Sequence, residues 1–190
     1  MEKNQSKNLL FDKTLMDAAV LSVAQSIISE YPAAEIPGLA FIGIQPRGVP
    51  FARRVIRGIH EITGGKPELG SLDISMYRDD IGMRKTLPVI YETCIPFDIN
   101  NRTIILVDDV LYTGRSIRAA LDALTDYGRP SYIRLAVLID RGLREFPIRA
   151  DYIGKSCVLS TDKTIRVEWE DSDGADAVYE CEKKHNEIIK

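Results

Sequence analysis

The sequence predicts a single α/β domain with a mostly parallel central sheet that is flanked by helices. Aliphatic runs typical of buried strands alternate with segments whose apolar residues recur at helical spacing. The chain has 190 residues and is 45% hydrophobic, which suits one good core and is short for two domains. Sheets of this kind place their functional groups beyond the carboxyl ends of the strands. The motifs that bind ligands or carry catalysis are therefore expected where the predicted strands end.

Periodicity and turn residues predict the order of the elements. Strands are expected at residues 38–44, 69–76, 104–107, 132–140, 150–159 and 164–170. Helices are expected at residues 12–29, 51–62 and 117–124. Residues 79–101 hold several Gly and Pro residues and form a long excursion with room for a hairpin. The polar end of the chain, from residue 171, is expected to be partly disordered.

Composition points to a soluble, cytoplasmic protein. The net charge is −3, with acidic and basic residues mixed along the chain, which argues against attraction of the whole surface to nucleic acid or to an anionic membrane. A local basic patch is still compatible with this balance. We find neither a membrane-spanning apolar run nor a signal-peptide core. The three cysteines, Cys94, Cys157 and Cys181, lack metal-ligand spacing and are expected to be free thiols.

The stretch IILVDDVLYTGRSIRAALDAL, residues 104–124, joins a strand, a turn and a helix. A helix start leaves backbone N–H groups unpaired and carries a partial positive charge. The turn Thr113–Ser116 holds a glycine and two hydroxyl side chains, so its donors can converge on a phosphate group. It is not a Walker loop, because GxxxxGK[ST] is absent. This turn is therefore predicted to bind a phosphate.

Two carboxylates, Asp108 and Asp109, stand between that strand and the turn. Adjacent acids repel each other and pack poorly, but they can accept hydrogen bonds from sugar hydroxyls or lie close to a cation. Together with the turn they fit a ribose 5-phosphate. The competing interpretation is a solvated strand end followed by a capped helix. The combination of strand, acid pair, Thr-Gly turn and helix argues against it.

The sequence VDDVLYTGRS resembles the phosphoribosyl-diphosphate motif of type I phosphoribosyltransferases. Beyond it, GIQPRG, LDISMYRDD and LAVLIDRGLREFPIRADYIGK resemble bacterial regulators of pyrimidine operons, which are bifunctional RNA-binding attenuators and uracil phosphoribosyltransferases. The resemblance covers most of residues 12–170. It implies the type I phosphoribosyltransferase fold with a flexible hood. The corresponding division is an N-terminal extension at 1–11, a phosphoribosyltransferase domain at 12–172 and a polar tail at 173–190.

The resemblance implies that uracil and phosphoribosyl diphosphate (PRPP) react to give UMP and pyrophosphate. Asp108, Asp109 and Arg47 would carry the catalysis, with Arg47 pairing with the leaving phosphate. A surface arginine before a helix is the alternative for Arg47. The loop expected to receive pyrophosphate is Gln45, Pro46, Arg47 and Gly48. The residues expected to bind the ribose and its phosphate are Asp108, Asp109, Val110, Leu111, Tyr112, Thr113, Gly114, Arg115 and Ser116.

The hood and the base side are expected to involve Tyr77, Arg78, Asp79 and Arg141. Gly82, Arg84 and Lys85 suit a loop that closes over an anionic substrate, although an ordinary exposed hairpin is the alternative. Arg141 could equally form a salt bridge with a nearby acid. Purine-using relatives usually carry Asp where this chain has Tyr112, which favours a pyrimidine base. The implied cofactor is Mg²⁺, held through PRPP near Asp108 and Asp109 rather than directly by a metal site.

The resemblance also implies an RNA partner, a pyrimidine-operon leader hairpin, with Arg144, Arg149 and Lys155 as candidate contacts. The first helix has Leu21, Ser22, Gln25 and Glu30 where better-known regulators carry Thr, Arg or His, and this should weaken binding. A homodimer or larger homo-oligomer is expected. Phe51 and Phe97 could serve an interface or the core. The alternatives are a hypoxanthine or guanine phosphoribosyltransferase, or a regulator with only vestigial catalysis.

Overall fold

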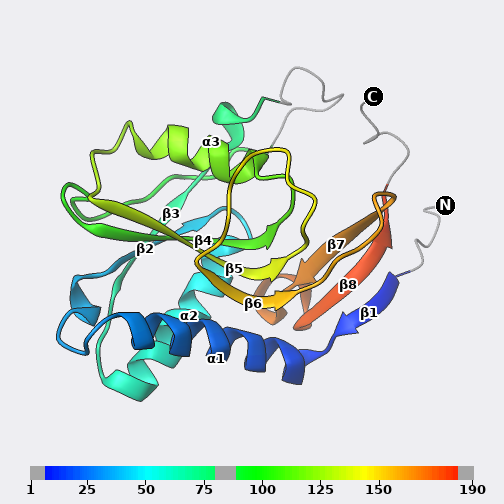
Figure 1. Cartoon of the computed structure of the whole chain (residues 1–190), viewed down its shortest axis with the longest axis horizontal. Helices are drawn as coiled ribbons and strands as arrows, with labels where there is room; N and C mark the ends of the chain where they lie inside the picture. The colour runs from blue at the N-terminus through cyan, green and yellow to red at the C-terminus, as the bar shows by residue number, and fades with distance from the viewer. Residues whose placement is uncertain (1–6, 80–88, 184–190) are drawn as a thin grey trace.

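A computed structural model of the chain describes residues 7–79 and 89–183. Its five-stranded parallel sheet has the order β3-β2-β4-β5-β6 (Figure 1). These strands are β2 (Ala40–Ile44), β3 (Glu68–Leu72), β4 (Thr103–Leu111), β5 (Tyr132–Asp140) and β6 (Tyr152–Ser156). The helices are α1 (Lys13–Glu30), α2 (Gly48–Thr63), α3 (Arg115–Leu124) and α4 (Glu170–Asp173), with short 3-10 helices at Ile36–Gly38 and Ser75–Tyr77.

Helices cover both faces of the parallel sheet, which explains its continuous aliphatic runs. α1 and α2 lie on one face and α3 lies on the other (Figure 1). Successive residues of a strand point to opposite faces. Ile105 and Val107 therefore pack in the core with α1 and α2, whereas Ile104 and Leu106 pack in the core with α3. The predicted α/β architecture with a mostly parallel sheet is confirmed.

A second, antiparallel sheet joins the two ends of the described chain in the order β1-β8-β7. Its strands are β1 (Lys7–Phe11), β7 (Lys163–Glu168) and β8 (Ala177–Glu182). The expectation of disorder near the end of the chain is wrong for β8, because Ala177, Val178 and Cys181 are buried. The domain boundaries drawn after residues 11 and 172 stay a prediction, and they separate strands that pair in this sheet.

Local contacts explain where the predicted elements begin and end. The predicted first helix is confirmed as α1, and the carboxylate of Asp12 caps it by accepting from the Leu15 N–H at 2.9 Å. The strand expected at 69–76 ends at Leu72. After it, the Asp73 carboxylate accepts from the N–H groups of Ser75 and Tyr91, each at 3.0 Å, which turns the chain.

The excursion at 79–101 lies partly outside the described residues, including Gly82, Arg84 and Lys85. Its described part contains a single bridge, Ser71 to Cys94, and no named strand. Cys94, Cys157 and Cys181 are free thiols. Within 7–79 and 89–183, no helix combines the length and apolar character needed to cross a membrane.

Candidate active site

The carboxyl end of β4 carries the acid pair. Asp108 is only 8% exposed and Asp109 is half-buried. The Asp109 N–H donates to the Asp108 carboxylate at 2.9 Å, and the Val110 N–H donates to the Asp109 carboxylate at 3.0 Å. Burial, reinforced by the charge of Asp109, raises the pKa of Asp108 well above its usual value. Burial also raises the pKa of Asp109, although the Asp108 hydrogen bond and Arg47 partly oppose the rise.

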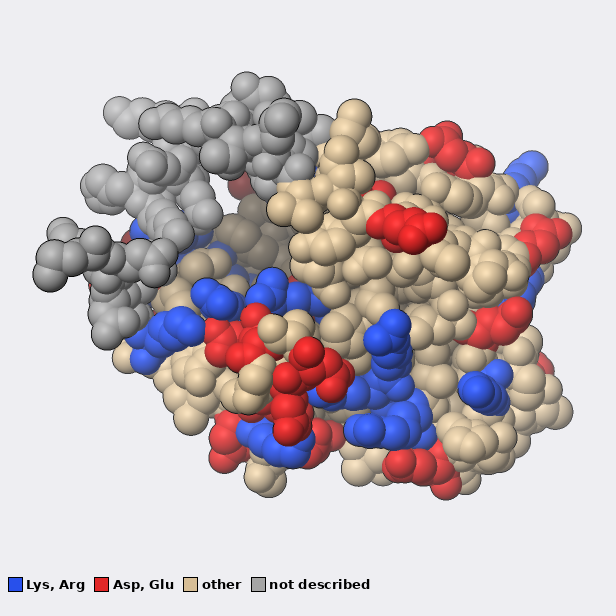
Figure 2. Space-filling view, turned by 180° about the vertical axis from the view of Figure 1, so that it is seen from behind, with Lys and Arg blue, Asp and Glu red and all other residues tan. Residues whose placement is uncertain are grey.

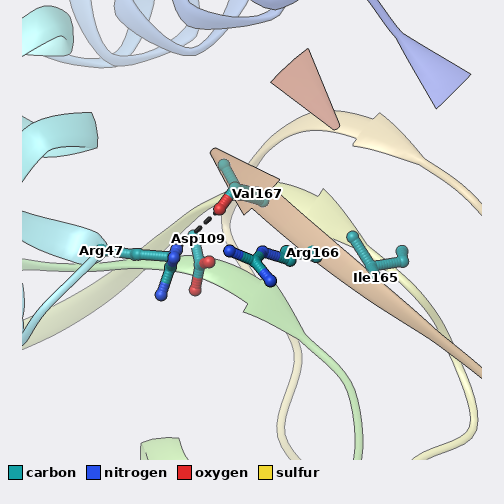
Figure 3. A pocket seen from close by; sticks show the side chains of 5 residues that line it. All are labelled: Arg47, Asp109, Ile165, Arg166 and Val167. Atoms are coloured by element: carbon teal, nitrogen blue, oxygen red, sulfur yellow. Dashed lines mark hydrogen bonds between the residues drawn. The ribbon is translucent and has the colours of Figure 1, made fainter. Parts of the chain in front are cut away.

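A cavity of about 440 Å³ opens beside this pair. It is lined by Arg47, Asp109, Ile165, Arg166 and Val167, and Figure 3 shows how these side chains lie. The volume is in the range of small-molecule sites. Its wall from β7 was missed by sequence reasoning, which identified residues 164–170 only as a late strand. This strand belongs to the second sheet, and its local sequence pattern does not indicate where that sheet packs. The sequence therefore carried only a weak signal that β7 lies at the cavity.

The predicted pyrophosphate loop joins β2 to α2 at the same edge of the sheet. The Gln45–Pro46 peptide bond is cis. Gly48 lies so close to β4 that a Cβ there would come within 2.3 Å of the Val107 carbonyl oxygen. Arg47 donates from Nε to the Val167 carbonyl at 2.6 Å and pairs from Nη2 with Asp173 at 3.1 Å. Arg47 therefore lines the cavity and is held by β7 and α4.

The predicted phosphate loop lies between β4 and α3. Gly114 adopts the left-handed region at φ 92° and precedes the first residue of α3. The Arg115 N–H makes a long bond of 3.4 Å to Thr113 Oγ1, and the N–H groups of Gly114 and Ser116 donate to no acceptor among the described residues. Arg78 Nη1 donates to Ser116 Oγ at 3.1 Å. The loop thus offers unpaired donors to a ligand next to the acid pair.

Two other residues expected at the hood also lie near α3. Asp79 pairs with the Arg115 guanidinium at 2.6 Å, and the Tyr77 hydroxyl donates to the Asp126 carboxylate. The described part of the hood is therefore anchored to the helix that follows the phosphate loop.

Arg141 is almost fully buried after β5, where its guanidinium lies 3.8 Å from the centre of the Tyr112 ring. It donates to the carbonyls of Ser160 and Lys163 at 2.9 and 2.6 Å. Among the described residues it forms no salt bridge, which was the alternative expected for it. Burial raises the Tyr112 pKa, but Lys183, 3.2 Å from the hydroxyl, and Arg141 outweigh that effect and lower it overall.

The three RNA-binding candidates differ in exposure. Arg149 and Lys155 are exposed, whereas the Arg144 guanidinium is taken up by acceptors of the protein itself. Basic and acidic side chains are interleaved on the face seen in Figure 2. On α1, Glu30 accepts from the Tyr152 hydroxyl at 2.6 Å and pairs with Arg134 at 3.5 Å. Of the three candidate cations, two are thus exposed and one is bound by the protein itself.

Residues 10–171 match the family model of the phosphoribosyl transferase domain, and the chain belongs to the phosphoribosyltransferase family. Two curated relatives are both named bifunctional protein PyrR. The one from a Roseiflexus species is 49% identical over 174 residues, covering 88% of this chain and 94% of the relative. The one from Clostridioides difficile is 45% identical over 172 residues, covering 90% and 96%. Within the family, the chain falls in the PyrR group.

Solved structures of purine enzymes share the fold. The hypoxanthine phosphoribosyltransferase of Trypanosoma cruzi superposes with a TM-score of 0.69 at 15% identity, covering 94% of this chain and 98% of that one. A hypoxanthine-guanine phosphoribosyltransferase from Bacillus anthracis gives 0.67 at 17% identity, covering 94% and 99%. At such identities the likeness concerns the fold alone. The predicted type I phosphoribosyltransferase fold is confirmed.

Proposed function

We propose that this protein transfers the phosphoribosyl group of PRPP to uracil, giving UMP and pyrophosphate. One observation carries the proposal: the acid pair of β4, the unpaired donors of the phosphate loop and Arg47 meet at one edge of the parallel sheet. This edge is where ligands bind in open α/β sheets. The membership of the chain in the PyrR group supports the same activity.

Each group has a distinct task in this reaction. Asp108 and Asp109 accept hydrogen bonds from the ribose hydroxyls, and the N–H groups of Gly114 and Ser116 bind the 5-phosphate. The bond from the anomeric carbon to pyrophosphate breaks, its electron pair leaves with the pyrophosphate oxygen, and a uracil nitrogen bonds to that carbon as it loses its proton. Arg47 exchanges Asp173 for the departing phosphate and offsets its charge. Positioning and charge stabilisation thus account for the catalysis.

The residues present fit a Mg²⁺ ion that is shared with PRPP. Mg²⁺ prefers oxygen ligands and is usually bound through one or two carboxylates together with substrate phosphates. Burial raises the pKa values of Asp108 and Asp109, and a cation nearby would lower them and so favour the charged forms. Across residues 7–79 and 89–183 no three His, Cys, Asp or Glu side chains are grouped to hold a metal ion. When bound, Mg²⁺ would offset charge on the pyrophosphate.

The wall of the cavity favours a small base. Ile165 and Val167 offer apolar surface, and Arg166 offers a donor. Tyr112 stands where purine-using relatives usually carry Asp, and Arg141 and Lys183 hold it in place. A purine phosphoribosyltransferase is therefore the less favoured alternative. Comparing uracil, hypoxanthine and guanine as acceptors of the phosphoribosyl group separates the two.

The test is pyrophosphate release from PRPP with Mg²⁺ and each base in turn, with UMP identified as the product of the uracil reaction. We expect turnover with uracil and little with the purines. Turnover with guanine or hypoxanthine alone would make this a purine enzyme. Absence of turnover with any base, while UMP still binds, would leave a regulator with vestigial catalysis.

We propose a second function, UMP-responsive binding of a pyrimidine-operon leader RNA. The bifunctional naming of the relatives and the exposure of Arg149 and Lys155 support it. Phosphate contacts dominate such binding, so its affinity should fall with added salt. Filter binding with a leader hairpin, with and without UMP, tests it. Undetectable binding in both conditions would remove this function, and the exposed Leu21 and Glu30 of α1 make weak binding the expected result.

We further propose a cytoplasmic homodimer or larger homo-oligomer. Phe51 is fully buried and stacks on Trp169 with ring centres 6.2 Å apart, so it belongs to the core. Phe97 is only partly buried and lines a surface cavity with Ile56 and Leu69. Light scattering after size exclusion measures the assembly directly, and a mass of one chain would contradict this proposal.

A further inference from the structure

The segment 141–148, which follows β5, contacts three consecutive residues, Leu111, Tyr112 and Thr113, where β4 ends and the phosphate loop begins. The Arg141 N–H donates to the Leu111 carbonyl at 2.9 Å. The N–H groups of Glu145 and Phe146 both donate to the Thr113 carbonyl, at 2.9 and 3.1 Å. This backing segment therefore supports the loop on the side of its carbonyl groups.

Arg144 is the centre of the backing segment. Its Nη1 donates to the carbonyls of Tyr112, Gly142 and Leu111 at 2.7, 3.0 and 3.3 Å. Its Nε donates to the Ile148 carbonyl at 3.0 Å, and its Nη2 pairs with Asp140 at 2.6 Å. The side chain is 21% exposed. One guanidinium thus ties the phosphate loop to both ends of the segment behind it.

Peptide geometry converts these contacts into an orientation of the loop. A trans peptide is planar, and its N–H points away from its C=O. The carbonyls of Leu111, Tyr112 and Thr113 all point to the backing segment. The N–H groups that share those peptides, on Tyr112, Thr113 and Gly114, therefore point away from it. Arg144 thereby fixes the peptides that carry the N–H groups of Tyr112 and Thr113. The N–H groups of Glu145 and Phe146 fix the next peptide, whose Gly114 N–H would face a 5-phosphate.

We propose that Arg144 is a positioning residue for the phosphate loop, which acts by holding the carbonyls of Leu111 and Tyr112. This inference rests on the proposed phosphoribosyl transfer. It replaces the expected role of Arg144 as an RNA contact, because the guanidinium is occupied by five acceptors of the protein. A small displacement of a positioned binding group can lower the reaction rate strongly, so a shift of the phosphate loop should be visible in the kinetics.

The test compares four variants with the wild type. Arg144→Gln removes the charge and most of the fork, and Arg144→Lys keeps the charge without the fork. Asp140→Asn keeps the acceptor for the Gly142 N–H, which lies 2.8 Å away, but weakens the ion pair with Arg144. Arg129→Gln is the matched control, because it removes an exposed arginine before β5 that has no part in the proposed sites. The readouts are KM for PRPP, KM for uracil, UMP affinity by calorimetry, leader-RNA affinity and thermal unfolding.

We expect Arg144→Gln to raise KM for PRPP and the Kd of UMP about tenfold to a hundredfold, with KM for uracil within about twofold. Arg144→Lys should recover part of this loss, and Asp140→Asn should show a smaller shift in the same direction. Arg129→Gln should leave KM for PRPP and the Kd of UMP unchanged. Unchanged UMP affinity in Arg144→Gln with lowered RNA affinity would overturn the inference in favour of an RNA contact. If Arg144→Gln does not fold, unchanged UMP affinity in Asp140→Asn would overturn it as well.

The wild type separates this inference from the function on which it rests. A wild-type protein that forms no UMP and binds none would overturn the proposed function and the inference together. A wild-type protein that is active, beside an Arg144→Gln variant with the same KM for PRPP, would overturn the inference alone.

Discussion

The two loops at the active edge of the sheet are built differently. In the phosphate loop, Gly114 supplies the backbone conformation, and the neighbouring segment 141–148 binds the carbonyls. In the pyrophosphate loop, the working group is the side chain of Arg47, and its partners Val167 and Asp173 lie more than a hundred positions away in the chain. The first loop presents backbone donors that are already fixed. The second presents a charged side chain that is already paired with Asp173.

The phosphate loop of the proposed site is therefore more preorganised than the loop that carries Arg47. A phosphate that binds to the first loop meets fixed N–H groups. A pyrophosphate that binds to the second competes with Asp173 for Arg47. The two loops should therefore respond differently to substitution: the first through binding of the 5-phosphate, and the second through stabilisation of the leaving group.

The largest effect is expected for Asp108→Asn/Asp109→Asn. Removing both charges weakens the acceptors for the ribose hydroxyls, because Asn keeps only a neutral amide oxygen, and it removes the carboxylates near Mg²⁺. We expect kcat/KM for UMP formation to fall at least about a thousandfold, measured by pyrophosphate release. The fold should be retained, because burial disfavours the charged form of both carboxylates and the neutral Asn side chains avoid that cost. Asp17→Asn, at an exposed position of α1, is the control, and unchanged turnover in the double variant would reject the assigned role.

The next effect is expected for Arg47→Ala. It removes the cation that faces the leaving group, so kcat should fall about a hundredfold, while UMP affinity changes little. Arg57→Ala is the control, because Arg57 is an exposed arginine of α2. Equal losses in kcat and in UMP affinity would mean that Arg47 supports the whole site and not the leaving group in particular.

A pair of glycine substitutions compares the two loops by stability. In Gly48→Ala the new Cβ would lie 2.3 Å from a backbone oxygen, so the loop must shift, at a loss of about 3 kcal/mol. In Gly114→Ala the left-handed backbone at φ 92° costs about 1–2 kcal/mol. Gly38→Ala has open space and should change stability by under about 1 kcal/mol. Urea unfolding measures the stability of all three variants. A larger loss of stability in Gly114→Ala than in Gly48→Ala would contradict this ranking of the two loops.

Local sequence patterns correctly predicted the strand, turn and helix that carry the acid pair and the predicted phosphate loop. The direction of the buried strand places the two acids at its carboxyl end. The glycine conformation and the start of the helix then set the geometry of the Thr-Gly turn. The parallel sheet followed from the same alternation. These features depend on residues that are close together in the chain.

The rest of the site depends on distant contacts that no local pattern encodes. β7 brings Ile165, Arg166 and Val167 over the end of β4 only because β8 pairs with both β1 and β7. The polar composition of the last residues concealed β8, whose buried residues Ala177, Val178 and Cys181 lack the regular alternation that is typical of a half-buried strand. Likewise, Arg144 looked like a surface cation in the sequence, and its role is visible only from the carbonyls around it.

The smallest predicted effect concerns the stability cost of the acid pair. Burial raises the pKa of Asp108 well above its usual value, so the folded protein retains a proton that the unfolded chain releases above a pH of about 4. The contribution of Asp108 to the free energy of unfolding is therefore largest in acid and is lost as the pH rises toward its folded pKa. Asp108→Asn should unfold at a higher temperature than the wild type at pH 8, by about 2–4 °C for each kcal/mol gained. The gain should shrink as the pH approaches 4, whereas a gain that grows in acid would contradict the burial of this charge.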